Sequence, residues 1–467
     1  MVRDEIKQII QKVVKAPKVL VEQPRDKSHG DYSTNIAMVV KKDPQEIAKL
    51  IKSDKYETKV VSGFINFFLS KDYIVKHLKD KVKNIGKGKK INVEFISANP
   101  TGPLTLGNGR GGFCGDVLSN VLEKSGYKVC REYYVNDAGN QIEKFWEYKG
   151  DYVKDLKKRV KTGDQAAKIV LKEMIRPTVK KMGIKFNKWT SQKSLKINLD
   201  YLKDLTYKKD NALWFKTTKF GDDKDRVLIK EDGKYTYLAY DVAYLKNKFD
   251  RGFNKLIFLW GADHHGYINR IKASAQALGY KDVDFIIFQL VHLFDGKKEV
   301  KMSKRAGNYI TIDELIDEVG LDVARFFFLQ RTAGNHLNFD LKLAKKKSQE
   351  NPVYYVQYAY ARICSILAKT KIKPGKIILD KDSELDLAKQ IIRFPEIVED
   401  TVSDYQVQRI PQYAIDLAEN FHRFYQECQV ISEDKKLTQA RLSLISITKD
   451  TLKQVFDLMG VSAPKKM

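Results

Sequence analysis

A glycine-rich turn between a strand and a helix is the first part of this sequence that could do chemistry. Residues 91–95 alternate apolar and polar side chains, as a short strand does, and the loop SANPTGPLTLGNG follows. Apolar residues then recur at helical spacing from Phe113 to Leu122, and Ser125 and Gly126 end the helix. This order offers backbone N–H groups at a helix N-terminus to an anion such as phosphate. A purely structural turn has the same pattern, so the motif alone leaves both interpretations open.

A second stretch carries two ammonium groups close together. Residues 300–310 read VKMSKRAGNYI, with Lys301 and Lys304 on a predicted loop before a helix start at Thr311. Ammonium groups placed in this way can stabilise negative charge that develops on phosphate oxygens. Nearby lysines are common in so basic a chain, and as a pair alone they could be solvated surface charges.

Gly261, Asp263 and His264 follow the apolar run KLIFLW, where a parallel strand is expected to end. An acidic residue in that place can accept hydrogen bonds from ribose hydroxyls. We expect His264 to contact nucleotide and not to bind metal together with His265, because sequence neighbours rarely ligate one ion. Since no Cys or carboxylate cluster at ligand spacing completes a site, no structural zinc is expected.

Two carboxylates could recognise a cationic substrate. Glu94 lies just before the glycine-rich turn, and Tyr237 and Asp241 are four residues apart on a predicted helix, hence on one face. Carboxylates pair with a guanidinium through two hydrogen bonds, which gives geometric selectivity. Taken singly, Glu94 or Asp241 would by default be an ordinary surface charge.

Composition favours a globular protein with a polyanionic partner. The chain has 467 residues, 43% of them hydrophobic and 31% charged, and its formal net charge is +26. Such an excess favours binding to phosphate backbones, although a general lysine bias would produce it too. The four cysteines form no CxxC pair, which favours a reducing compartment. Because neither an apolar leader nor a membrane-length apolar run is present, we expect a cytoplasmic protein that does not contact membranes.

The pattern of elements predicts three domains. Residues 1–86 are expected to form a small α+β domain in which at least two of Phe64, Phe67 and Phe68 are core residues. Residues 87–345 alternate strand and helix signals, as in a doubly wound parallel sheet of the Rossmann type, with a charged helical insertion at 151–182. Residues 346–467 show helical patterns alone and predict an all-α bundle. Four tyrosines cannot share one face of its first helix, so some should be exposed: Tyr354, Tyr355, Tyr358 and Tyr360.

Across nearly its whole length, and in the same order, the chain resembles the class I aminoacyl-tRNA synthetases, most closely the arginyl-tRNA synthetases. The stretches that carry this resemblance are GDYSTNIAM, GFINFFLS, VEFISANPTGPL, REYYVNDAGNQI, YLAYDVAYLKNKFDRG, WGADHHGY, VKMSKRAGN and the C-terminal SAPKKM. The resemblance implies an arginine–tRNA ligase that uses ATP, with Mg²⁺ carried by the nucleotide, and has L-arginine and tRNA-Arg as partners. It also implies a monomer, an N-terminal domain that touches the outer corner of the tRNA, and an anticodon-binding C-terminal bundle.

The resemblance also implies roles for individual residues. Lys304, assisted by Lys301, would face the ATP phosphates. Glu94, Tyr237 and Asp241 would hold the guanidinium of arginine, and Ser97 and Asn99 its α-amino end. The implied ATP-binding set is Leu106, Gly107, Gly109, Gly261, Asp263, His264, Met302 and Ser303, and the implied tRNA-binding set is Tyr354, Tyr355, Tyr358 and Met467.

One motif departs from the family pattern. The first signature of the family reads His-apolar-Gly-His, whereas this chain has Thr105-Leu106-Gly107-Asn108. Thr and Asn can also donate hydrogen bonds to phosphate, as neutral groups, and the helix N-terminus is available whatever the side chain. We therefore expect Thr105 and Asn108 to be catalytic residues of an active enzyme. The alternative is a catalytically inactive, synthetase-like protein that still binds tRNA.

Overall fold

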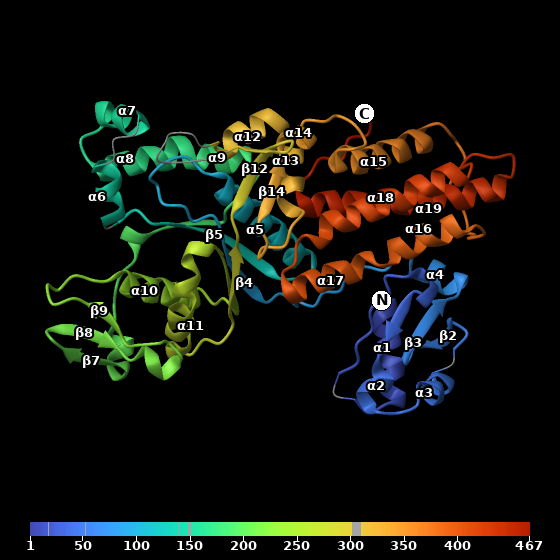
Figure 1. Ribbon diagram of the computed structural model, residues 1–467, viewed down its shortest axis with the longest axis horizontal. Coiled ribbons are helices and arrows are strands. Elements are labelled where there is room, and N and C mark those ends of the chain that lie inside the picture. The colour runs from blue at the N-terminus through green and yellow to red at the C-terminus, as the bar shows by residue number, and fades with distance from the viewer. Residues whose placement is uncertain (17, 52, 139, 148–150, 301–309) are drawn as a thin grey trace.

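The computed structural model describes residues 1–16, 18–51, 53–138, 140–147, 151–300 and 310–467. Three parts can be followed in Figure 1. The N-terminal part lies beneath helices of the C-terminal bundle, and the central part, with its parallel sheet, lies at the other end of that bundle. This architecture agrees with the predicted fold class, whereas the exact boundaries at 86/87 and 345/346 remain predictions.

Five parallel strands form the central sheet. They lie in the order β11-β10-β4-β5-β6. The chain first adds β5 and β6 on one side of β4, and then adds β10 and β11 on its other side. Such a reversal creates a crevice at the carboxyl ends of the two central strands, the usual ligand position in open α/β sheets. The strands are β4 (Lys90–Glu94), β5 (Lys128–Val135), β6 (Lys188–Ser191), β10 (Lys255–Gly261) and β11 (Val283–Phe288).

Helix α5 (Leu106–Lys124) connects β4 to β5 and packs closely on the sheet. Its apolar residues are buried, and two glycines permit the close approach. A Cβ on Gly115 would lie 2.4 Å from Phe95, and one on Gly112 would lie 2.7 Å from Met182. A side chain at Gly115 would collide with Phe95 at the end of β4 and push α5 away from the sheet.

Several elements of the central part were not predicted from the sequence. Strands β7 (Thr206–Lys209), β8 (Ala212–Phe215) and β9 (Arg226–Ile229) form a separate antiparallel sheet. Residues 283–294 form an apolar run in the sequence, but the structure divides it between β11 and a strand of a third sheet. That sheet contains β12 (Val291–Asp295), β13 (Lys298–Val300) and β14 (Leu337–Asp340).

Helices surround these sheets. The charged insertion forms α7 (Asp151–Arg159), α8 (Gly163–Ile169), a π-helical stretch (Val170–Ile175) and α9 (Arg176–Lys181), preceded by α6 (Asn140–Glu147). Lys157, Lys158 and Arg159 are exposed. The other helices of the central part are α10 (Tyr237–Asp250), α11 (Ile268–Ala277), α12 (Ile312–Val319), α13 (Leu321–Leu329) and α14 (Leu341–Ala344).

The N-terminal part is a three-stranded antiparallel sheet with four helices. At least two of three phenylalanines were expected in its core, but Phe67 is buried, Phe68 is half-buried and Phe64 is 41% exposed, so this expectation is wrong. The elements are α1 (Val2–Val13), β1 (Tyr32–Thr34), α2 (Ile36–Val40), α3 (Pro44–Leu50), β2 (Tyr56–Val61), β3 (Phe64–Leu69) and α4 (Lys71–His77).

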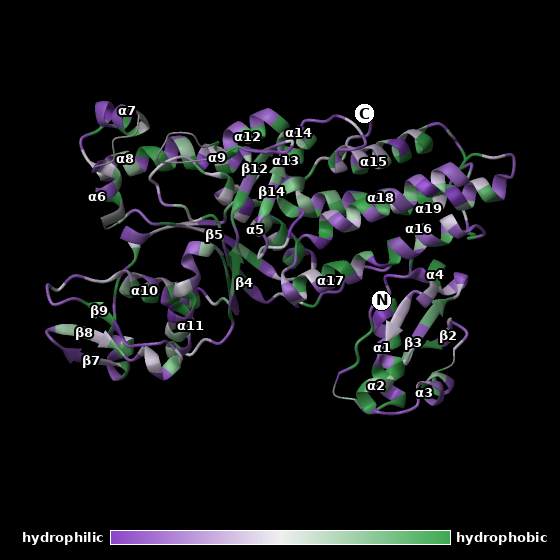
Figure 2. Ribbon diagram, viewed as in Figure 1, coloured by the Kyte–Doolittle hydropathy of each residue, from purple (hydrophilic) through white to green (hydrophobic). Residues whose placement is uncertain are grey.

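In residues 346–467, all of which are described, helices are the regular elements and no strand occurs. Apolar and polar residues alternate along these helices, as expected for amphipathic elements (Figure 2). The stretch 385–402 is not one helix, because Pro395 at the start of α17 cannot continue the ladder of α16. The helices are α15 (Pro352–Ala368), α16 (Asp382–Ile392), α17 (Phe394–Asp404), α18 (Arg409–Glu427) and α19 (Lys435–Met459).

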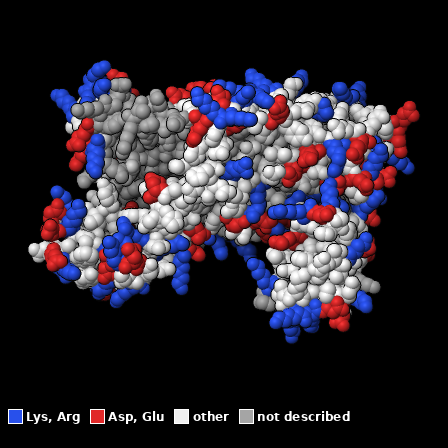
Figure 3. Space-filling model, viewed as in Figure 1, with Lys and Arg blue, Asp and Glu red and all other residues white. Residues whose placement is uncertain are grey.

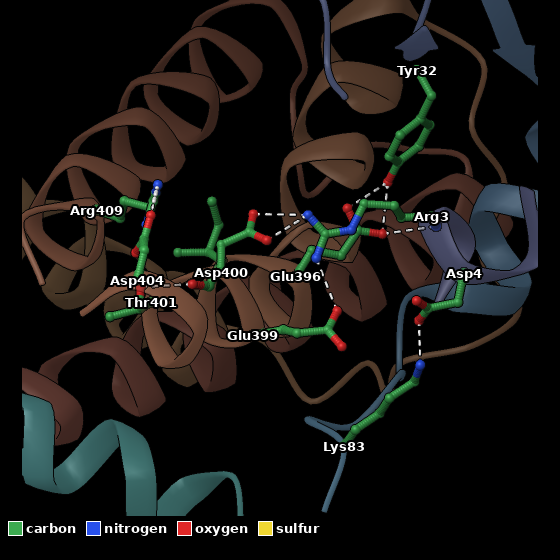
Figure 4. Close-up of polar contacts among 11 residues, drawn as sticks. Arg3, Asp4, Tyr32, Lys83, Glu396, Glu399, Asp400, Thr401, Asp404 and Arg409 are labelled. Carbon is green, nitrogen blue, oxygen red and sulfur yellow. Dashed lines mark hydrogen bonds and ion pairs between the residues drawn. The ribbon is translucent and has the colours of Figure 1, made fainter. Parts of the chain in front are cut away.

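Charged contacts dock the N-terminal part on α17 (Figure 4). The Arg3 guanidinium donates to Asp400 at 2.7 Å and 2.8 Å and to Glu399 at 2.9 Å. The Arg3 backbone N–H and the Tyr32 hydroxyl both donate to Glu396, which is buried. Burial raises the pKa of Glu396, and the charge of Arg3 opposes that rise. A buried carboxylate thus depends on two residues from the other end of the chain.

Charge is distributed over the whole molecule. On the face shown in Figure 3, Lys and Arg side chains are interspersed with Asp and Glu over all three parts. Within the described residues, no helix has both the length and the apolar character needed to cross a bilayer.

Candidate active site

A cavity of about 1250 Å³ opens where β4 and β10 end. Its lining combines the end of β4, the loop before α5, the first turn of α5, and residues of β5, α10, β10 and η6 (Ala262–Tyr267). Most of the predicted site residues that are described line this one cavity, although they are far apart in the sequence. They are Glu94, Ser97, Asn99, Thr105, Leu106, Gly107, Asn108, Tyr237, Asp241, Gly261, Asp263 and His264.

Thr105 and Asn108 form a reciprocal cap at the N-terminus of α5. Asn108 Oδ1 accepts from the Thr105 backbone N–H at 3.0 Å and from the Thr105 hydroxyl at 3.0 Å. In return, the Asn108 backbone N–H donates weakly to Thr105 Oγ1 at 3.5 Å. The first N–H groups of the helix have no intrahelical partners, and the helix dipole favours an anion beside them. The two side chains therefore fix the helix end that faces the cavity.

Gly109 does not line the cavity. A Cβ at this position would lie 2.6 Å from Ile312 Cδ1, so the glycine allows α5 and α12 to pack closely. The start of α12 is further joined to α5 by an isolated bridge between Thr105 and Thr311 and by donation from Ile312 N to Leu104 O at 3.1 Å. Ile310 also lines the cavity. Four predicted residues precede it and lie outside the described residues: Lys301, Met302, Ser303 and Lys304.

Glu94 is 4% exposed and belongs to a buried ion pair. Its Oε2 accepts from Lys248 Nζ at 2.6 Å, and the same ammonium donates to Asn92 Oδ1 at 2.7 Å. Lys248 itself is 0% exposed. Asn92 also donates to Glu132 Oε2 at 2.6 Å. The polar residues of β4 thus point into a buried polar network, because α10 covers this side of the strand.

Asp241 also lies on the cavity wall, on the same helix as Lys248. Its Oδ2 accepts from the Tyr267 hydroxyl at 2.8 Å. Burial raises the pKa of Asp241 to about 7; the Tyr267 hydrogen bond opposes the shift and the charge of Glu94 adds to it. Tyr237, one turn earlier on α10, also lines the cavity but is 46% exposed. A cation placed in the cavity would favour the charged form of Asp241.

The turn after β4 places polar groups beside the two carboxylates. Ile96 and Ser97 have positive φ values of 64° and 39°, which end the strand. The Ser97 hydroxyl accepts from the Tyr134 backbone N–H at 3.0 Å, and Asn99 follows on the cavity wall. Tyr134 stacks on Tyr244 with ring centroids 4.4 Å apart, and both rings line the cavity.

The residues after β10 are solvent-accessible. The side chain of Asp263 is 81% exposed and that of His264 is 60% exposed, with the two groups 3.6 Å apart. Gly261 ends β10, and His265 is exposed. This edge can therefore accept a polar ligand without displacing core residues. Among the described residues, no group of three or more His, Cys, Asp or Glu is arranged to hold a metal ion.

The tyrosines of α15 lie far from the cavity on the helical bundle. Tyr354, Tyr355 and Tyr358 are half-buried and Tyr360 is buried, so the expectation that some of the four are exposed is wrong. The His422 ring of α18 lies 4.7 Å from that of Tyr355 and 5.9 Å from that of Tyr358. Met467, at the end of the chain, is 57% exposed.

Several residues of the site were not predicted from the sequence. Lys248, Asn92 and Glu132 form the buried network, and Tyr267 binds Asp241. One signal for Lys248 exists, since it follows Asp241 by seven residues and hence lies on the same helical face two turns later. Asn92 and Glu132 have no such signal, because polar residues in an alternating strand ordinarily face solvent.

Comparisons with known proteins place all three parts in one family. The sequence matches the arginyl tRNA synthetase N terminal domain over residues 1–69. It matches the catalytic domain of tRNA synthetases class I (R) over residues 72–160 and 143–331, and the DALR anticodon binding domain over residues 356–467. It is 42% identical to an arginine–tRNA ligase of Bacillus subtilis, with 100% of this chain and 98% of the relative covered. It is 40% identical to one of Carboxydothermus hydrogenoformans, with 96% and 94% covered.

Solved structures agree. A Campylobacter jejuni protein assigned as an arginyl-tRNA synthetase is similar with a TM-score of 0.77 and 34% identity, over 85% of this chain and 100% of that one. The Thermus thermophilus arginyl-tRNA synthetase has a TM-score of 0.83 over 100% of both chains, and at 19% identity it supports the fold alone. With 42% identity across its full length, this chain belongs to the arginyl-tRNA synthetase family of class I aminoacyl-tRNA synthetases.

Proposed function

We propose that the protein is an arginine–tRNA ligase. It activates L-arginine with ATP to arginyl-adenylate, transfers the arginyl group to tRNA-Arg, and releases AMP and pyrophosphate. One observation carries the proposal: a single cavity joins two carboxylates, Glu94 and Asp241, to the N-terminus of α5. The relatives named above are ligases, and nothing in them favours the inactive tRNA-binding alternative.

Arginine binds with its guanidinium at Asp241 and Glu94, and Tyr237 closes that end of the site. Ser97 and Asn99, on the turn after β4, hold the α-amino group. Because that turn leads directly into α5, the α-carboxylate of arginine then points toward the helix N-terminus. The supporting geometry is the position of all five residues on the wall of one cavity.

ATP places its phosphates at the first turn of α5, where Leu106 and Gly107 present backbone N–H groups and the helix dipole favours anions. Thr105 and Asn108 hold this turn in place through their mutual cap. Gly261, Asp263 and His264 contact the adenosine. Lys301, Met302, Ser303 and Lys304 complete the phosphate site, and Mg²⁺ is held mainly by the nucleotide itself.

The chemical step needs no protein nucleophile. The carboxylate of arginine attacks the α-phosphate in line, the bond to the β-phosphate breaks, and pyrophosphate leaves. Negative charge develops on phosphate oxygens, so the protein contributes positioning and electrostatic stabilisation. The α5 N-terminus and Lys304 supply the stabilising positive charge.

The tRNA contacts the helical bundle through Tyr354, Tyr355 and Tyr358, with Met467 near the end of the chain. Half-buried rings on one helix can stack on unpaired bases while remaining anchored in the protein. The monomeric state and the cytoplasmic location remain predictions.

Exchange of labelled pyrophosphate into ATP tests the activation step. We expect exchange to depend on arginine and to be absent with lysine or citrulline, because lysine has no planar guanidinium and citrulline has no charge. Running the assay with and without tRNA-Arg tests whether activation requires bound tRNA, as the family resemblance implies. Exchange supported equally by lysine would contradict the assigned arginine pocket.

A further inference from the structure

We propose that Lys248 is a positioning residue for the amino-acid substrate. It neutralises Glu94 and fixes its carboxylate, so that Asp241 alone supplies the unpaired negative charge for the substrate guanidinium. This inference rests on the proposed function, because it concerns the same arginine site.

The ammonium group of Lys248 is enclosed by two aromatic rings and bound by two acceptors. The ammonium is held between the Tyr244 and Phe258 rings, with Nζ 4.5 Å from each ring centroid. Its two hydrogen bonds go to Glu94 and Asn92 on β4. Because Lys248 is fully buried and absent from the cavity wall, it acts on a substrate through neighbours that line the cavity, and Glu94 is the one of these to which it donates a hydrogen bond. A buried ammonium with two fixed acceptors holds the carboxylate far more rigidly than an exposed lysine would.

The second carboxylate of this network, Glu132, is also paired with a cation. Glu132 on β5 accepts from Asn92 and from the Arg251 guanidinium, each at 2.6 Å. The nearby positive charges lower the pKa of Glu132 against the effect of its burial. The network therefore contains two carboxylates and two cations, and it offers no net charge to a ligand. Glu94 is left as a hydrogen-bond acceptor held at a fixed place on the cavity wall.

Asp241 differs because its direct partner is neutral. The Tyr267 hydroxyl donates to it, and Arg270 lies against the Tyr267 ring, 4.4 Å from the centroid, from where its charge opposes the rise in the pKa of Asp241. At this end of the cavity, away from the exposed Asp263, a guanidinium thus meets the carboxylate of Asp241 and one fixed neutralised acceptor, Glu94. This charge balance matches a side chain with a single positive charge and several N–H donors.

The test is a double-mutant cycle on the arginine KM, measured by pyrophosphate exchange with saturating tRNA-Arg. We expect Lys248→Met to raise the arginine KM at least about tenfold, while the ATP KM changes by less than about twofold. In a Glu94→Gln background the same substitution should add nothing, because its effect passes through the Glu94 carboxylate. Lys246→Met is the matched control: this lysine is on the same helix but pairs with Asp250 at the surface.

Each outcome separates this inference from the proposed function. If Lys248→Met raises the arginine KM by the same factor in both backgrounds, or not at all, the positioning role is wrong while the ligase assignment stands. If Glu94→Gln leaves the arginine KM unchanged, the arginine site is assigned wrongly and the role of Lys248 fails with it. Should Lys248→Met not fold, Lys248→Gln keeps a hydrogen-bond donor, removes the charge, and enters the same cycle.

Discussion

The backbone of Thr105 is bridged to that of Thr311, and each threonine caps the helix that follows it. Thr105 forms a reciprocal cap with Asn108 at the start of α5, and Thr311 forms one with Glu314 at the start of α12. The bridge places two helix N-termini side by side at the cavity. It also ties the start of α5 to Thr311, which follows the lysine-containing stretch 301–309 by two residues.

Removing the cap at Thr105 should reduce activity by shifting the N-terminus of α5. Thr105→Ala is expected to cost about 1 kcal/mol of stability and to lower kcat/KM at least about tenfold, because the α5 N-terminus faces the reacting phosphate. Thr162→Ala is the matched control, since Thr162 caps α8 by the same kind of bond to Gln165 N. Steady-state kinetics and thermal unfolding compare the two variants. Equal activity in both would mean that the cap at Thr105 has no role beyond stability.

Arginine binding should weaken as the pH falls through 7. Burial raises the pKa of Asp241 to about 7, so acidification protonates the carboxylate that pairs with the guanidinium. The arginine KM is expected to rise between pH 8 and pH 6, while the ATP KM changes less. Asp241→Asn should have a high arginine KM at every pH. A wild-type profile that is flat over this range would contradict the role given to Asp241.

The raised pKa of Asp241 also predicts that replacing this residue with Asn stabilises the protein, by an amount that depends on pH. A carboxyl whose folded pKa is raised contributes stability below its ordinary value of 3.8 and loses it as the pH rises toward about 7. Without substrate, Asp241→Asn should therefore raise the unfolding temperature more at pH 8 than at pH 5. Thermal unfolding at the two pH values measures this difference, and an equal change at both would show that the carboxyl is not perturbed.

Sequence patterns predicted which residues line the cavity but not the buried hydrogen bonds and ion pairs behind its wall. The strand–turn–helix unit, the carboxylates and the residues after β10 could be placed because parallel strands bring their carboxyl ends together. Asn92 and Glu94 alternate with apolar residues, which is typical of a strand with one solvated face. Here α10 covers that face, and Lys248 and Glu132 satisfy the buried polar groups. Such contacts depend on tertiary packing and leave little trace in local sequence.

Thr105 and Asn108 show a second limit of prediction from sequence. Thr105 and Asn108 were expected to donate hydrogen bonds to phosphate, yet in this structure their side chains bond to each other. A Thr followed by Asn three residues later at a helix start is a recognisable capping pattern.

Lys304 should matter for chemistry and little for tRNA affinity. Lys304→Ala is expected to lower kcat by at least about 100-fold because its charge is matched to the developing negative charge on phosphate. The Kd for tRNA should change by less than about twofold, because the proposed partner of Lys304 is the phosphate of ATP and not the tRNA. Lys297→Ala, an exposed lysine on the preceding hairpin, serves as the control. Comparable losses in kcat and in tRNA affinity would show that Lys304 binds tRNA instead.

Docking of the N-terminal part should depend on Arg3. Arg3→Met removes the partner of Glu399 and Asp400, and leaves buried Glu396 without the nearby positive charge, at a cost of about 3 kcal/mol. Lys83→Met, which breaks a solvent-accessible pair with Asp4, should cost less than about 1 kcal/mol. The first thermal transition and the rate of proteolysis between residues 78 and 90 report the difference. Similar effects of the two substitutions would mean that apolar packing, not Arg3, holds the parts together.

Attachment of radiolabelled arginine to tRNA-Arg tests the central claim most directly. With ATP and Mg²⁺ present, we predict acid-precipitable arginyl-tRNA with arginine but not with lysine, and loss of the product when Asp241 is replaced by Asn. The result would show that a cavity with Thr105 and Asn108 at its helix end supports the full reaction. Binding of tRNA-Arg without any charging, at all tested substrate concentrations, would contradict the ligase assignment and favour a protein that binds tRNA without acting on it.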